Sequence, residues 1–203
     1  MPLAISKDSR REDFVQAAAA LIADRGFHGT SIAAVADQLG VTKQALLHHF
    51  GSKERLYGEV LAGISDRMMA VLVEGQEERM SPEARLETFF AIYCEQALAD
   101  STDVRIIVRE LMDNKQRAEQ AGKWYLKPFL QELAAMVQDT GRWREASRNE
   151  AMLVAYQMLG AVSYFAISDP TLARMFGQDA HDDMARRFPD QVQYSLQRIL
   201  GSI

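Results

Sequence analysis

The chain has 203 residues and a net charge of −5, with only five prolines and twelve glycines. This length holds one or two domains with a sizeable core. The single cysteine, Cys94, excludes an internal disulfide and fits a reducing compartment, so we expect a cytoplasmic protein. We find no secretory signal pattern and expect no membrane partner, since no apolar run looks long enough to span a bilayer.

Apolar spacing predicts helices along the whole chain and no convincing strand. The expected fold is all-α, with an N-terminal three-helix domain, a C-terminal helical bundle and about nine helices in total. The expected helices cover residues 8–25, 31–39, 43–49, 52–78, 81–100, 103–113, 115–138, 148–167 and 189–200.

Prolines and caps predict several boundaries. Ser81 and Pro82 form a strong helix start, as a cap followed by proline in the first turn. We expect Pro128 to kink or divide its helix and Pro170 to end the preceding one, with a short helix over 171–176. Pro189 is expected to begin the last helix.

Residues 30–57 have the pattern of a helix-turn-helix followed by the start of a longer helix. Thr30 or Ser31 caps a helix whose apolar stripe is Ile32, Val35, Ala36 and Leu39. Gly40 supplies the turn, and Thr42 caps the next helix, on which Leu46 and Phe50 face inward.

The outward side chains of this unit suit a DNA groove. Lys43 and Lys53 suit phosphates, Gln44 suits adenine, and Leu47 suits a thymine methyl group. The candidate DNA contacts are Thr30, Ser31, Thr42, Lys43, Gln44, Leu47, His48, His49 and Lys53. A metal site at His48 and His49 is disfavoured, because adjacent helical residues face different ways.

The charge distribution agrees with a short DNA site. Residues 1–11 and 41–55 each carry a net charge of +2, and the first sixty residues are neutral overall. Such a domain is expected to bind a short site without coating DNA, and its non-specific affinity should be modest.

The motif resembles the DNA-binding region of the TetR family of bacterial transcriptional regulators. The residues that carry the resemblance are Thr30-Ser31-Ile32, Val35-Ala36, Leu39-Gly40-Val41-Thr42, Leu46-Leu47-His48-His49-Phe50 and Ser52-Lys53-Glu54-Arg55-Leu56. Leu47 departs from the pattern, which commonly has tyrosine there, so one phosphate hydrogen bond is expected to be absent.

The resemblance implies a homodimeric, ligand-responsive transcriptional regulator, and it favours a repressor over an activator. Residues 1–51 would bind double-stranded DNA, and residues 52–203 would bind an unknown small molecule and dimerise through the last two long helices. Candidate interface residues are Met152, Ala155, Leu159, Val162, Val192 and Leu196. Candidate ligand contacts are Phe89, Tyr93, Arg105, Arg109, Met112, Trp124, Phe129, Tyr156 and Tyr164.

Several alternatives stay open. Arg105 and Arg109 share a helix face and would hold an anionic effector or pair with nearby carboxylates. Cys94 is expected to be a buried, inert residue rather than a redox sensor. Two other interpretations compete with a repressor. One is a regulator that activates transcription, and the other is a helical adaptor that binds protein. No catalytic constellation, cofactor motif or metal cluster is recognised, so we expect no enzyme and no cofactor.

Overall fold

The computed structural model describes residues 7–74, 76, 79–113 and 125–201. Over these residues the chain is all-α, with nine helices and no strand. The described helices are α1 (Lys7–Gly29), α2 (Ile32–Gln38), α3 (Lys43–Phe50), α4 (Lys53–Val73), α5 (Pro82–Ala99), α6 (Thr102–Asp113), α8 (Lys127–Asp139), α9 (Arg148–Phe176) and α10 (Gln178–Leu200).

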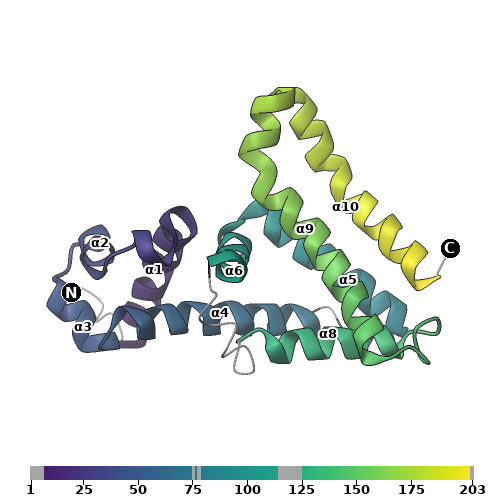
Figure 1. The fold of residues 1–203 in the computed structure, drawn as a ribbon, viewed down its shortest axis with the longest axis horizontal. Coiled ribbons are helices and arrows are strands. Elements are labelled where there is room, and N and C mark those ends of the chain that lie inside the picture. Colours follow the sequence, from purple (N-terminus) through teal and green to yellow (C-terminus); the bar gives the residue numbers. More distant parts are fainter. Residues whose placement is uncertain (1–6, 75, 77–78, 114–124, 202–203) are drawn as a thin grey trace, which may run out of the picture.

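Figure 1 shows a small head and a larger body joined by one long helix. α1, α2 and α3 form the head, and α4 runs from the head along the body. α5, α6, α8 and α9 build the body, while α9 and α10 form a helical hairpin that rises from it. The helix α4 therefore connects the head to the body, where it packs against α5 and α8.

Serine and threonine caps begin the helices where the sequence predicted them. The side chains of Ser31, Thr42, Ser52 and Ser81 each accept a hydrogen bond from the backbone N–H three residues later, at 3.0–3.2 Å. Each cap satisfies a backbone donor that the first helical turn leaves unpaired. Ser31, rather than Thr30, is the cap of α2.

The head is tied together around Phe14 and Arg11 of α1. Phe14 is buried and meets Phe50 edge-on, with ring centroids 6.0 Å apart. The Arg11 guanidinium pairs with Glu59 of α4, and its Cζ lies 4.6 Å from the centroid of the Phe50 ring. These contacts join the first, third and fourth helices of the chain.

Two of the prolines do not break helices as the sequence predicted. α9 continues through Pro170 to Phe176, and α10 begins at Gln178 with Pro189 in its interior. The break falls at Gly177, whose φ of 88° lies in the region that glycine alone adopts readily. Pro128 lies in the first turn of α8, where its missing N–H costs nothing. The expected helical stretch over 115–124 falls outside the described residues.

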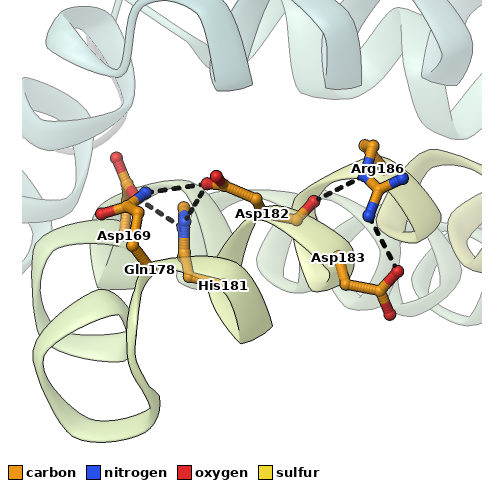
Figure 2. A network of polar contacts seen from close by, with 6 residues as sticks. All are labelled: Asp169, Gln178, His181, Asp182, Asp183 and Arg186. Atoms are coloured by element: carbon orange, nitrogen blue, oxygen red, sulfur yellow. Dashed lines mark hydrogen bonds and ion pairs between the residues drawn. The ribbon is translucent and has the colours of Figure 1, made fainter.

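Contacts between α9 and α10 explain why α9 continues past Pro170. The ring of Phe165 stacks on Phe188 of α10 with centroids 4.0 Å apart. Nε2 of the buried His181 lies 2.5 Å from Asp169 Oδ1, which precedes the proline (Figure 2). A proline removes one helical hydrogen bond, and tertiary contacts of this kind offset that loss.

The same network fixes the first turn of α10. His181 Nδ1 lies 3.4 Å from Asp182 Oδ1, and the Gln178 amide donates to the same oxygen at 2.8 Å (Figure 2). These hydrogen bonds, that from Gln178 first, lower the pKa of the Asp182 carboxyl. The tip of the hairpin is therefore held by side chains from both helices.

Four of the six predicted interface residues are buried inside the chain itself. Ala155, Val162, Val192 and Leu196 are at most 3% exposed, so they pack within the α8, α9 and α10 core. Assigning these four to a dimer surface is therefore wrong. Met152 and Leu159 are half-buried. The exposed apolar residues of the hairpin are instead Leu153, Tyr156, Tyr164, Met175, Phe176 and Tyr194.

By length and composition, α9 could cross a membrane, which corrects the expectation that no such run exists. Residues 151–168 carry no charged side chain. Core helices of soluble proteins pass the same test, and α9 packs on α8 and α10. Those contacts account for its apolar character along the inner face.

Gly177 and Pro170 give a direct test of which residue ends α9. Gly177→Ala forces an L-residue into the left-handed region and should lower the free energy of unfolding by roughly 1–2 kcal/mol. Pro170→Ala should not lower it, because alanine restores a helical N–H. Urea unfolding at one fixed protein concentration measures both variants. A larger loss for Pro170→Ala than for Gly177→Ala would contradict this account.

Candidate DNA-binding surface and ligand cavity

α3 presents a polar face away from the head. Leu46 and Phe50 are buried in the core, whereas Lys43, Gln44 and His48 are exposed. The Thr42 hydroxyl accepts from the Ala45 N–H at 3.2 Å and thereby begins the helix. An exposed helix N-terminus with a lysine and an amide is suited to phosphate and base contacts.

Thr30 does not belong to this surface. It is 3% exposed, and its hydroxyl donates to the Gly26 carbonyl at 2.9 Å. That carbonyl lies where α1 kinks, so the hydroxyl serves the bend between α1 and α2. The prediction that Thr30 contacts DNA is therefore corrected, whereas its neighbour Ser31 is exposed.

The other predicted contacts divide between outward and inward positions. Leu47 and His49 are half-buried, and the His49 ring lies 5.2 Å from that of Phe14. Lys53 begins α4, where its Nζ lies 4.2 Å above the Phe27 ring. This cation–π contact holds the ammonium group against α1, and Lys53 is half-buried.

A cavity of about 250 Å³ lies in the body and is partly open to solvent, since Leu111, Tyr156 and Tyr164 in its lining are exposed. It is bounded by α4, α5, α6, α8 and α9, and its lining is mostly apolar. The lining residues are Met68, Tyr93, Ile107, Val108, Leu111, Leu126, Phe129, Leu130, Tyr156, Leu159, Gly160, Ser163, Tyr164 and Ile167.

Four of the predicted ligand contacts meet at this cavity: Tyr93, Phe129, Tyr156 and Tyr164. Phe89 is instead a core residue that stacks on Tyr93 with centroids 5.8 Å apart. Met112 is 74% exposed and does not line the cavity. Trp124 lies outside the described residues. The sequence missed Gly160 and Ser163, although a glycine and a serine inside an apolar helix are themselves a signal.

Arg105 and Arg109 do not line this cavity, so the structure does not bring them together with the four residues above. Arg105 Nε donates to Ser101 within α6, at 3.1 Å. Arg109 donates to the backbone carbonyl of Asp24 in α1, at 3.0 Å. Both arginines therefore make local or head-to-body contacts.

α6 connects the cavity to the head. Ile107, Val108 and Leu111 line the cavity, while Glu110 is buried on another side of the helix. The Tyr57 hydroxyl of α4 donates to Glu110 Oε2 at 2.5 Å. Together with the Arg109 contact, this hydrogen bond couples α6 to both α1 and α4.

Cys94 is buried in α5 and is a free thiol. Burial raises its pKa to about 11, so the reactive thiolate is scarce at neutral pH. This environment agrees with an inert core cysteine.

A family model described as bacterial regulatory proteins of the tetR family matches residues 14–60, which span the helix-turn-helix. The HTH-type transcriptional repressor KstR2 of Mycobacterium tuberculosis is 35% identical over 83 residues. Residues 14–60 therefore have the helix-turn-helix of the TetR family of bacterial regulatory proteins.

The comparisons differ in how much of the chain they cover. The KstR2 match spans 41% of this chain and 42% of that repressor. The HTH-type transcriptional regulator RutR of Escherichia coli is 23% identical over 192 residues, covering 95% of this chain and 89% of RutR. The structure of FadR from Bacillus subtilis, solved with stearoyl-CoA, has a TM-score of 0.70 at 16% identity, covering 91% of this chain and 96% of FadR. The body thus shares the fold of TetR-family regulators.

The role of Thr30 can be tested by Thr30→Val, which removes the buried hydroxyl with little change of shape. We expect a loss of about 1–3 kcal/mol in the free energy of unfolding, because the Gly26 carbonyl loses its donor. Thr30→Ser keeps the hydroxyl and should recover most of this loss. If Thr30→Val leaves stability unchanged and lowers the salt dependence of DNA binding, then Thr30 contacts phosphate after all.

Proposed function

We propose that this chain is a repressor that binds a palindromic operator as a homodimer and leaves it when a small molecule enters the body. Residues 1–51 act as the DNA-binding head, and residues 52–203 bind the effector and dimerise. The protein acts in the cytoplasm, which fits its buried free cysteine. The observation that carries this proposal is the exposed polar N-terminal half of α3 on a TetR-family helix-turn-helix.

In this proposal α3 lies in the major groove of one half-site. Gln44 reads an adenine through its amide, and Lys43 contacts guanine or phosphate. Thr42, Ser31 and His48 are exposed and approach the backbone, as Lys53 does from the start of α4. Leu47 and His49 are half-buried and contribute less to the contact surface.

The hairpin of α9 and α10 supplies the dimer surface. Leu153 is 69% exposed and Tyr194 is 53% exposed, and both are large apolar side chains on the outer face of the hairpin. Tyr156 and Tyr164 are also exposed on α9, but they line the body cavity and are not part of the proposed interface. Exposed large apolar side chains on one hairpin are typical of a protein interface. Pairing two hairpins would set the separation of two heads, which must match half-sites about 34–36 Å apart or somewhat more.

The effector acts through α6. A molecule that fills the cavity presses on the side of α6 that holds Ile107 and Val108. The opposite contacts of α6, from Glu110 to Tyr57 and from Arg109 to Asp24, pass the displacement to α4 and α1. The heads then lose their match to the operator. The effector must bind the DNA-incompetent state better, and DNA must weaken effector binding by the same factor.

The relatives support a ligand-responsive body. FadR carries stearoyl-CoA in its structure, and KstR2 is a repressor. An activator differs in one measurable respect, since its ligand would strengthen DNA binding or transcription. A helical adaptor is the weaker reading, because a protein-binding α3 would expose apolar side chains where this chain exposes Lys43 and Gln44.

Gln44→Ala tests base reading. It should cost roughly 1–3 kcal/mol on the cognate site and relax the preference at one position in each half-site. The operator is first obtained by selection from random DNA with the wild-type protein. Selection is then repeated with the variant, and an unchanged consensus would show that Gln44 reads no base.

Lys53→Ala is the matched control for Gln44→Ala. It should weaken binding to all sequences about equally and reduce the slope of log affinity against log salt by about one contact. A change in base preference without a change in slope would place Lys53 at a base instead of at the backbone.

The dimer surface can be tested with Leu153→Glu combined with Tyr194→Glu. Both side chains are exposed in the single chain, so the variant should stay helical while the dimer dissociates and operator binding is lost. Sedimentation and circular dichroism measure the two effects. Ala155→Glu is the contrasting variant, because it places a charge in the core and should unfold the chain. A double variant that remains dimeric would place the interface elsewhere.

A further inference from the structure

We propose that the body cavity binds a neutral, mostly apolar molecule of one or two rings that carries one hydrogen-bonding oxygen. The hydroxyl pair of Tyr93 and Ser163 would hold that oxygen. This ligand class rests on the proposed function, since it names the effector of the same cavity.

The lining sets the charge of the ligand. No charged side chain among the described residues lines the cavity, and the nearby arginines of α6 are engaged elsewhere. A buried charge without a partner is strongly disfavoured in an apolar environment. By contrast, a second cavity of about 240 Å³ among α4, α5 and α8 is lined by Arg85, Glu132 and Asp139, and suits polar contents.

The volume sets the size of the ligand. A cavity of about 250 Å³ is larger than the roughly 150 Å³ space that takes one benzene ring. It is smaller than the roughly 300–1,000 Å³ typical of drug-sized ligands. A compact molecule of one or two rings therefore fills it, and a longer ligand would have to extend out of the cavity.

Two hydroxyl groups supply the specific polar contact. Tyr93 Oη and Ser163 Oγ lie 3.2 Å apart and join α5 to α9 at the cavity wall. Their mutual hydrogen bond uses one hydroxyl proton, so the other proton can be donated to a ligand oxygen. Burial raises the pKa of Tyr93, which keeps its hydroxyl protonated as a neutral donor.

Gly160 marks where the ligand passes α9. It lines the cavity, it is exposed, and a Cβ built at this position would meet nothing within 4 Å. Tyr156 and Tyr164 lie one helical turn on either side and also line the cavity. A glycine inside a helix costs about 1 kcal/mol relative to alanine, and no packing within the described residues requires it. The opening beside its backbone gives a flat ring a path between the two tyrosines.

Three naphthalene compounds test the ligand class by calorimetry on the full chain without DNA. Naphthalene has no polar group, 2-naphthol adds one hydroxyl, and naphthalene-2-sulfonate adds a charge. We expect 2-naphthol to bind once per chain, naphthalene to bind about 2- to 12-fold more weakly, and the sulfonate at least about tenfold more weakly. A sulfonate that binds as tightly as 2-naphthol would overturn the proposal.

Matched variants locate the contact. Ser163→Ala combined with Tyr93→Phe removes both hydroxyl groups, so it should reduce 2-naphthol affinity to that of naphthalene and leave naphthalene affinity unchanged. Ser168→Ala is the control on the same helix, because its hydroxyl donates to the Tyr164 carbonyl and it does not line the cavity. Equal effects of the two variants on 2-naphthol would contradict the assigned contact.

A second pair of variants tests the opening. Gly160→Leu should weaken naphthalene and 2-naphthol alike by at least about tenfold, whereas Ala161→Leu places the same side chain one residue along, outside the lining, and should not. Circular dichroism confirms that each variant is folded. Absence of binding by all three compounds to the wild-type chain would refute the ligand class, while selection of an operator from random DNA tests the proposed function separately.

Discussion

A buried hydrogen bond between Tyr57 and Glu110 ties α6 to α4, the helix that connects the head to the body. A carboxylate at 7% exposure must keep strong partners, because losing them would leave a charge in an apolar environment. α6 therefore cannot slide along α4 without an energetic cost. The head-side contact of Arg109 reinforces this arrangement from the same helix. Any motion of α6 caused at the cavity has to be shared by the helices that carry α3.

α9 shows an unusual division between its two faces. Its inner face carries small side chains such as Ala151 and Ala155, which let α8 and α10 approach closely. Its outer face carries Leu153, Tyr156 and Tyr164, which are larger and exposed. The buried face also holds Val154, Met158 and Val162. Tyr156 and Tyr164 line the cavity, so they are assigned to the proposed ligand, whereas Leu153 is assigned to the proposed dimer.

The helix breaks show where local rules give way to packing. Pro170 and Pro189 predicted two helix ends, but the structure places both inside helices. Each proline removes one backbone donor, and the contacts of Phe165 with Phe188 and of Asp169 with His181 offset this cost. Gly177 ends α9, because the chain reverses its direction there with a φ of 88°, which glycine alone adopts readily. A local pattern cannot weigh contacts between helices that are distant in the sequence.

The sequence by itself determined the head and the type of fold. The features that predicted α2 and α3 all lie within a few residues of one another along the chain. They are the caps Ser31 and Thr42, the turn at Gly40 and the inward pair Leu46 and Phe50. Tertiary structure alone decided which side of α9 faces inward. Ala155 and Tyr156 are both apolar, yet the first is in the core and the second is exposed, because the placement of α8 and α10 selects the buried face. For the same reason, the cavity and the roles of Thr30, Arg105 and Arg109 depend on contacts across the chain that spacing along a single helix does not encode.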